Sequence, residues 1–243
     1  MRDSVDRAML NLAAGLRKHA WRMRRAASRR RRLKREGRGD FTQSHAASMA
    51  GRTALAQSPG RGPGFFVEEG ANDGFLESKT YELERGFGWR GLLVEPAPEL
   101  ARAARLARPD SHVVCCALVG SGFDRTHITL GYAAPMTRIG QIADHPRTLA
   151  TDAPSHLFHA PARTLTSLLD EVGRLEVDFL SLDVEGYRAA APGGLAERHA
   201  PRIVLVEVGD RDERREDVER VLGSRYEVLN RPTGRDLLCR RLD

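Results

Sequence analysis

From residue 65 onward, short apolar runs alternate with segments in which apolar residues recur at helical spacing. The runs with the length of buried strands are Phe65–Val67, Arg90–Glu95, His112–Val119, Val177–Asp183 and Arg202–Val208. The segments with helical character are Leu76–Arg85, Ala97–Ala107, Thr164–Val172 and Asp212–Leu222. Strands that alternate with helices are typical of α/β proteins with a parallel sheet. The pattern therefore predicts a Rossmann-like, doubly wound, mostly parallel sheet.

Two stretches depart from this alternation. Gly120–Pro161 is rich in proline and small residues, and we expect an irregular segment there that covers a substrate. The apolar stretches Tyr226–Leu229 and Leu237–Cys239 come after the last predicted helix. They predict an antiparallel hairpin that completes the sheet at the C-terminal end of the chain.

The first predicted strand leads into a turn with the features of a nucleotide-binding loop. The strand ends in Glu68, and the turn-forming residues 70–74 follow. Glycine is needed where the backbone takes a positive φ or approaches a ligand closely, and a helix N-terminus supplies N–H donors. An acid about 20 residues beyond such a loop accepts hydrogen bonds from ribose hydroxyls, and Glu95 has this spacing. The expected cofactor-binding residues are Glu68, Gly70, Asn72, Gly74 and Glu95.

The glycine spacing indicates which nucleotide is bound. A dinucleotide fingerprint that starts at Gly70 needs glycine at positions 72 and 75, which are Asn72 and Phe75. The chain also has no phosphate-binding loop of the Walker type. The remaining pattern of one acid and two glycines suits a ligand with a sulfonium and an amino-acid moiety, which is S-adenosylmethionine. The alternative is a tight turn without a ligand, and the spacing of Glu95 argues against it.

Four blocks of the chain resemble the FkbM-type methyltransferases. FVEEGANDG at Phe66–Gly74 resembles the glycine loop of that family, and GWRGLLVEP at Gly88–Pro96 resembles its second-strand motif. RTLTSLLDEVG at Arg163–Gly173 and VDFLSLDVEGY at Val177–Tyr187 resemble its helix and fourth-strand motifs. The blocks follow the family's order. The resemblance implies a class I fold that binds S-adenosylmethionine and methylates hydroxyls of sugars and other natural products.

Two residues depart from the family's pattern. Glu69 stands where the family usually has an apolar strand residue, and Arg188 stands where it usually has glutamate. No role is carried over to the side chain of Arg188.

Asp183 and Glu185, at the end of the fourth predicted strand, are the candidates for the chemistry of methyl transfer. One carboxylate would act as the base or orient the acceptor hydroxyl, or both would hold a divalent cation that acidifies it. The structural alternatives are a loop hydrogen bond for Asp183 and a helix N-terminal charge for Glu185. Glu207 is a third candidate acid or a surface carboxylate. A histidine of the irregular segment is the other candidate base, and these are His127, His145, His156 and His159.

Charge separates an N-terminal arm from the rest of the chain. Residues 1–40 contain 14 Lys and Arg but only 4 Asp and Glu, so the basic net charge belongs to them. We expect a poorly ordered arm and linker over residues 1–60 and a methyltransferase domain over residues 61–243. Apolar residues among the arginines would let the arm form a basic helix that contacts a membrane surface or nucleic acid weakly. The alternative function is therefore a noncatalytic or nucleic-acid-binding module that uses this arm.

The cysteines and the hydropathy indicate the compartment. Cys115, Cys116 and Cys239 have no CxxC spacing, so we expect reduced thiols and no zinc site. No uninterrupted apolar segment has the length of a transmembrane helix. We expect a cytoplasmic enzyme whose partner is a small-molecule hydroxyl acceptor.

Overall fold

The structure is a computed structural model, and it describes part of the chain. The described residues are 55–56, 62–75, 78–132, 156–174, 176–182, 199–208, 216, 218–219, 222–230 and 236–242. They fall into two compact units, of which the smaller contains residues 128–132 and 156–159. Residues 1–54 lie outside the described residues, so the arm over residues 1–60 stays a prediction.

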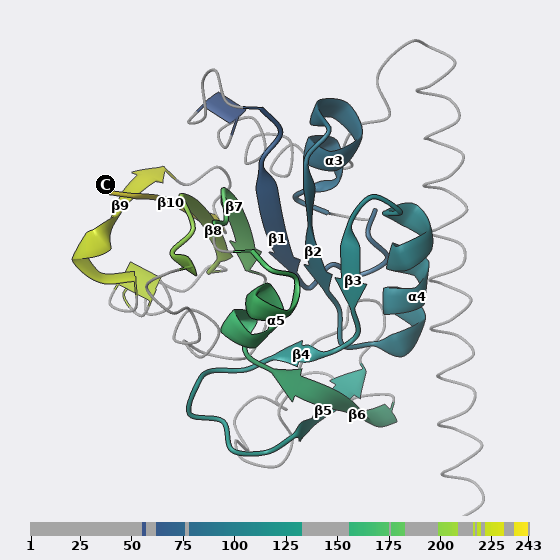
Figure 1. The fold of residues 1–243 in the computed structure, drawn as a ribbon. Helices are drawn as coiled ribbons and strands as arrows, with labels where there is room; N and C mark the ends of the chain where they lie inside the picture. The colour runs from purple at the N-terminus through teal and green to yellow at the C-terminus, as the bar shows by residue number, and fades with distance from the viewer. Residues whose placement is uncertain are drawn as a thin grey trace, which may run out of the picture. The chain divides into compact units, whose positions relative to one another are not determined.

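A seven-stranded sheet forms the centre of the larger unit (Figure 1). Its strand order is β3-β2-β1-β7-β8-β10-β9. The first five strands in this order are parallel, whereas β10 is antiparallel to both of its neighbours. The strands are β1 (Phe65–Glu69), β2 (Arg90–Val94), β3 (His112–Val114), β7 (Phe179–Leu182), β8 (Ile203–Glu207), β9 (Tyr226–Asn230) and β10 (Asp236–Arg241). The predicted mostly parallel sheet and its terminal antiparallel hairpin are both confirmed.

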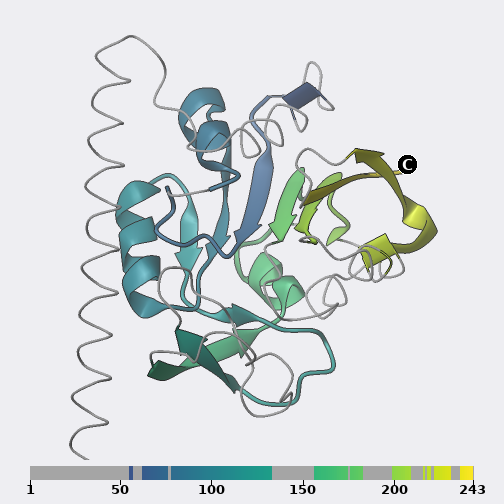
Figure 2. The same cartoon turned by 180° about the vertical axis from the view of Figure 1, so that it is seen from behind.

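Three α-helices with defined bounds accompany this sheet in the part of the chain that the structure describes. They are α3 (Tyr81–Phe87), α4 (Pro98–Ala107) and α5 (Leu165–Glu171). α3 contacts β2, and α4 contacts β3 at the edge of the sheet, as the view from behind also shows (Figure 2). A short helix of the 3-10 type, η3 (Gly223–Arg225), leads into β9. A separate three-stranded sheet has the order β4-β6-β5, with β4 (Ala117–Leu118), β5 (His127–Tyr132) and β6 (His156–Arg163).

Successive side chains of a strand point to opposite faces, and the sheet is apolar on both. The first core cluster contains Phe65 and Val67 of β1, Leu180 of β7 and the apolar face of α5. The second contains Phe66 of β1, Phe179 of β7 and Leu83 of α3. Leu55, which belongs to the predicted arm, packs half-buried against the second cluster. We call these two faces the α5 face and the α3 face.

The structure corrects three sequence-based expectations. The helix expected over Leu76–Arg85 begins only at Tyr81, because the hydroxyl of Ser78 accepts from the Tyr81 N–H at 3.1 Å and holds the preceding residues in a turn. The strand expected over His112–Val119 is divided between β3 and β4, which belong to different sheets. The segment expected to be irregular over Gly120–Pro161 contains β5 and most of β6.

Candidate functional site

The turn after β1 has the backbone conformation that its sequence predicted. Gly70, Asn72 and Gly74 all have positive φ, at 71°, 52° and 75°. Glycine adopts this region without a steric penalty, and asparagine is among the few other residues that enter it. The turn is also joined to β2, because the Gly70 and Ala71 N–H groups donate to the Val94 carbonyl at 3.0 and 3.1 Å. The loop therefore bends back over the carboxyl ends of β1 and β2.

Six successive backbone donors of this loop are engaged within the protein. Besides Gly70 and Ala71, Asn72 N–H donates to Glu95 Oε2, and Asp73 N–H donates to Asn72 Oδ1. Gly74 N–H donates to the Ala71 carbonyl, and Phe75 N–H donates to Asp73 Oδ1. A phosphate loop instead directs several such N–H groups at its ligand. The hydrogen bonding therefore agrees with the exclusion of a pyrophosphate ligand from the glycine spacing.

Glu95 lies directly after β2, where it links three segments of the carboxyl edge. Its Oε2 accepts from Asn72 N–H and its Oε1 accepts from Ala97 N–H, both at 2.9 Å. Its own N–H donates to the Val114 carbonyl of β3 at 3.1 Å. Each carboxylate oxygen has two lone pairs and can accept more than one hydrogen bond. Glu95 is thus held beside the loop, as the sequence spacing predicted.

The carboxylate of Glu68 accepts hydrogen bonds from residues 78–80, which lead from the loop to α3. Its Oε2 accepts from Ser78 Oγ at 2.8 Å and from Thr80 Oγ1 at 2.6 Å. Its Oε1 accepts from Lys79 N–H at 2.5 Å. The side chain is buried, with an exposed fraction of 2%. Glu68 therefore contributes to the predicted site by fixing residues 78–80.

Arg108, directly after α4, lies at the centre of the same network. Its Nε donates to Glu84 Oε2 at 2.9 Å. Its Nη1 donates to the Gly74 carbonyl and to Ser78 Oγ, and its Nη2 donates to the carbonyl and the Oγ1 of Thr80. Nη1 is also 3.6 Å from Glu68 Oε2. The side chain is fully buried, so two carboxylates share one buried cation.

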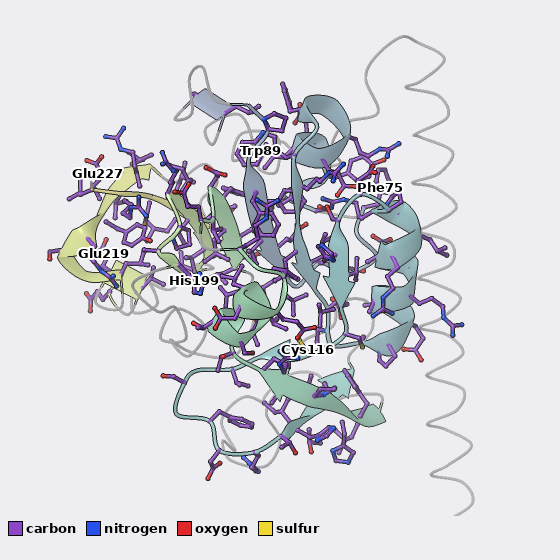
Figure 3. The ribbon with its side chains drawn as sticks, in the orientation of Figure 1. Phe75, Trp89, Cys116, His199, Glu219 and Glu227 are labelled. Carbon is purple, nitrogen blue, oxygen red and sulfur yellow. The ribbon has the colours of Figure 1, made fainter. Side chains whose placement is uncertain are left out.

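The network around Arg108 extends to the α3 face of the sheet. The guanidinium lies over the rings of Phe66 and Tyr81, with its carbon 5.2 and 5.6 Å from their centroids. Phe75, labelled in Figure 3, makes an edge contact with the same Tyr81 ring. Ser111 Oγ donates to Glu84 Oε2 and accepts from the Gly91 N–H. The guanidinium, its carboxylate partners, the aromatic rings and the hydroxyls thus form one buried layer next to the loop.

Sequence reasoning missed Arg108. A single arginine at the end of an amphipathic helix has the same pattern as its exposed neighbours Arg102 and Arg105. The one signal in the sequence was Gly74 itself, because a glycine in a loop next to a helix predicts a close approach of the backbone. A Cβ at Gly74 would lie 2.9 Å from Arg108 Cγ and 3.0 Å from Ala104 Cα.

Buried acids are unusually frequent near this loop. Glu68, Glu69, Asp73, Glu82, Glu84 and Glu95 are all buried, and Arg108 is the only buried arginine or lysine of the described residues. Four of these acids, Glu68, Glu69, Asp73 and Glu95, lie at the carboxyl ends of β1 and β2 or in the loop, whereas Glu84 lies toward the start of β2 through Ser111. Such an environment favours a ligand that carries positive charge and hydroxyl donors.

The cysteines lack the properties of a nucleophile. Burial raises the pKa of the Cys116 thiol to about 12 and also raises the pKa of Cys115. Cys115 and Cys116 form no disulfide within the described residues, and their reduced state stays a prediction. Cys116 lies beyond the carboxyl end of β3, at the opposite end of the strands from Trp89 (Figure 3). Across the described residues, no group of three or more His, Cys, Asp or Glu side chains has the geometry of a metal site.

The candidate residues for the chemistry are only partly covered by the structure. Asp183 and Glu185 lie outside the described residues, directly after β7, so their roles stay predictions. The same holds for His145 and for the side chain of His156. His127 and His159 lie on β5 and β6, and their Nδ1 atoms are each 3.1 Å from a threonine hydroxyl. Glu207 is the last residue of β8.

Comparison with known proteins gives one family. The model of the methyltransferase FkbM domain matches residues 68–227 of this chain. No curated protein matches the chain. Within the described residues, no helix has the length and hydropathy needed to cross a membrane.

The solved structures similar to the chain include three methyltransferases or cofactor-bound proteins. A methyltransferase from Geobacter sulfurreducens has 12% sequence identity and a TM-score of 0.49, with 89% of this chain and 90% of that chain covered. A mutant of MtNAS in complex with S-adenosylmethionine has 11% identity and a TM-score of 0.47, with 97% and 78% covered. The Podospora anserina methyltransferase PaMTH1 bound to S-adenosylhomocysteine has 13% identity and a TM-score of 0.43, with 84% and 80% covered.

Proposed function

Because the chain belongs to the FkbM methyltransferase family, we propose that it methylates a hydroxyl of a sugar or a specialised metabolite. The chain is an S-adenosylmethionine-dependent methyltransferase, and this class defines the cofactor. The acceptor is the part that we propose, together with the residues that hold each reactant. A small molecule with a hydroxyl is the proposed partner.

One observation carries the proposed cofactor site. The loop over residues 70–75 has its backbone donors engaged, whereas Glu95 and other buried acids offer acceptors beside it. S-Adenosylmethionine presents an ammonium group, a sulfonium and ribose hydroxyls, which need acceptors and negative charge. We assign the ribose hydroxyls to Glu95 and the amino-acid moiety to the loop of Gly70, Asn72 and Gly74. Glu68 holds residues 78–80, which lead from this loop into α3.

The chemistry requires little beyond positioning and one proton transfer. When bound, S-adenosylmethionine supplies a methyl group on a good leaving group. The protein aligns the acceptor oxygen for in-line attack and removes its proton. Asp183 and Glu185 follow β7, which is hydrogen-bonded to β1, so they would leave the same edge of the sheet as the loop. Asp183 is our candidate for the base, and a divalent cation held by the pair is the other route.

The cellular location is part of the proposal. Cys115 and Cys116 are adjacent cysteines that form no disulfide within the described residues, which is typical of a reducing compartment. We therefore propose that the enzyme works in the cytoplasm.

Cofactor binding tests the assignment of Glu95. We expect wild type to bind S-adenosylmethionine and S-adenosylhomocysteine, and Glu95→Gln to lose about 1–3 kcal/mol of binding free energy because a charged acceptor is replaced. The measurement is isothermal titration calorimetry. Glu99→Gln is the matched control, since Glu99 is an exposed acid on the first turn of α4. Equal affinity of wild type and Glu95→Gln would remove Glu95 from the site.

Methyl transfer tests the acceptor class and Asp183. A panel of sugars, other hydroxyl compounds and nucleic acids is incubated with labelled S-adenosylmethionine, and we expect label only on hydroxyl compounds. Asp183→Asn should keep cofactor affinity but slow transfer by about 100-fold or more, the contribution of a general base. An EDTA and Mg²⁺ titration distinguishes a proton acceptor from a cation site. A stable and fully active Asp183→Asn variant would exclude Asp183 both as proton acceptor and as cation ligand.

A further inference from the structure

The structure assigns Arg108 as a positioning residue of the cofactor loop, an inference that rests on the proposed cofactor site. Its guanidinium binds several points of residues 74–84, a stretch that lies 24–34 residues earlier in the chain. Glu84 lies in α3, Gly74 ends the loop, and Ser78 and Thr80 precede α3. Arg108 thereby fixes the far end of the loop and the residues that lead from it into α3.

The geometry uses the full donor set of the side chain. A guanidinium has five N–H groups in a planar fork, and the five hydrogen bonds of Arg108 are distributed over Nε, Nη1 and Nη2. The distances are 2.9–3.3 Å, so each is an ordinary hydrogen bond. A lysine has three donors on one atom and could not reach both Glu84 and the Thr80 carbonyl. The site therefore requires arginine for its shape as well as its charge.

The loop is held at two ends by different means. At the sheet end, Val94 and Glu95 accept from the N–H groups of Gly70, Ala71 and Asn72. At the far end, the Gly74 carbonyl is held by Arg108. A segment fixed in this way loses less conformational entropy when it binds a ligand, so affinity is higher. Arg108 contributes to affinity through the loop, without touching the cofactor.

Glu68 and Glu84 define what Arg108 holds in place. Glu68 Oε2 lies 3.6 Å from Nη1 and accepts from Ser78 and Thr80, so the acid and the arginine bind the same two hydroxyls, the acid as acceptor and the arginine as donor. Glu84 Oε2 accepts from Arg108 Nε and Ser111 Oγ. Removal of the arginine would leave two buried carboxylates without their cation. The segment over residues 78–80 would then separate from Glu68 or become solvated.

Three measurements on Arg108→Lys test the inference. We expect the affinity for S-adenosylhomocysteine to fall about tenfold, and the KM for S-adenosylmethionine to rise while kcat at saturation stays near wild type. We also expect faster tryptic cleavage after Lys79, followed by mass spectrometry, because the Lys79 N–H would lose its fixed position against Glu68. Arg102→Lys is the matched control, since Arg102 is exposed on the same helix. It should behave as wild type in all three measurements.

The outcomes separate positioning from a purely structural role. A lower melting temperature of Arg108→Lys with unchanged affinity and unchanged cleavage after Lys79, both measured well below melting, would overturn the inference. If Arg108→Lys does not fold, Glu84→Gln tests the same contact, because it keeps the volume and removes the charge that Nε faces. We then expect a smaller loss of affinity, about threefold, and unchanged values for Glu84→Gln would overturn the inference.

A failure of the proposed cofactor site has a different signature. If wild type binds neither S-adenosylmethionine nor S-adenosylhomocysteine, the cofactor role of Arg108 is overturned together with the proposed function. Cleavage after Lys79 needs no ligand, so it still decides whether Arg108 orders the segment over residues 78–80.

Discussion

The two faces of strand β1 are built from different chemistry. On the α5 face, Phe65 and Val67 pack against leucines and valines of the neighbouring strands and of α5. On the α3 face, Phe66 lies below the Arg108 guanidinium, and Glu68 binds the hydroxyls of Ser78 and Thr80. The two faces alternate residue by residue, so a single strand supports an apolar core and a buried polar network.

The difference indicates how stability and geometry are divided in this molecule. Apolar burial stabilises without fixing direction, whereas hydrogen bonds to a guanidinium require defined distances and angles. A buried ion pair adds little net stability, since desolvation offsets much of the attraction. The α3 face contains buried ion pairs despite this desolvation cost. The hydrogen bonds around Arg108 on this face reach the loop that we assign to the cofactor. The Arg108 network on the α3 face therefore sets the position of the loop, and the apolar clusters of both faces supply stability.

The largest expected effect separates the faces by unfolding. Arg108→Met should lower the free energy of unfolding by about 3–5 kcal/mol, because Glu68 and Glu84 are left buried without a cation. Val67→Ala, on the same strand but the α5 face, should cost about 2 kcal/mol through lost burial and a cavity. Urea denaturation measures both.

The double variant Arg108→Met with Glu84→Gln sharpens this comparison. It leaves one buried carboxylate fewer than Arg108→Met alone, so it should recover part of the lost stability. Val67→Ala should in addition keep the wild-type affinity for S-adenosylhomocysteine. A smaller loss of unfolding free energy for Arg108→Met than for Val67→Ala would contradict this comparison of the two faces.

A smaller effect concerns the α5 face at alkaline pH. Cys116 packs in that face, and burial raises the pKa of its thiol from 9.0 to about 12. The unfolded chain releases this proton near pH 9 while the folded protein keeps it. The stabilisation is therefore complete below pH 9 and is lost as the pH rises toward 12, by about 1.4 kcal/mol per pH unit.

Urea denaturation between pH 8 and pH 11 checks this slope. Cys116→Ala should be less stable at pH 8 but should lose less stability per pH unit above pH 9. Tyr226, whose pKa is raised to about 12 by burial, should add a second loss above pH 10 in both proteins. Parallel curves for wild type and Cys116→Ala would mean that the thiol titrates alike in both states.

The sequence predicted the parts of the fold that depend on local patterns. β1, β2 and β8 appear within two residues of their apolar runs, because a buried parallel strand is apolar on both faces. β5 and β6 were missed, although Ile128 and Leu130 alternate with polar residues, because histidine, proline and glycine in these segments are typical of loops. The later start of α3 depends on Ser78, whose hydroxyl accepts from the Tyr81 N–H three residues on and donates to Glu68 ten residues earlier, and the second contact forms only on folding.

The same limit applies to the candidate site. The positive φ at Gly70, Asn72 and Gly74 and the position of Glu95 beside them follow from residue type and spacing. Arg108 could not be found in this way, since its partners lie 24–34 residues earlier in the chain. Contacts between distant segments leave no periodic pattern. The sequence therefore indicated where a cofactor would bind, but not what holds that region in shape.

The packing of Gly74 against Arg108 has a consequence for how this family member evolves. A side chain at position 74 would collide with Arg108 Cγ and with the α4 backbone at Ala104, and its φ of 75° already disfavours other residues. A shorter residue 108 would relieve only the contact with Cγ, because the α4 backbone and the φ of 75° would remain, and it would abandon Glu84. Neither substitution is neutral, so glycine at 74 and arginine at 108 are both expected to resist single-site drift.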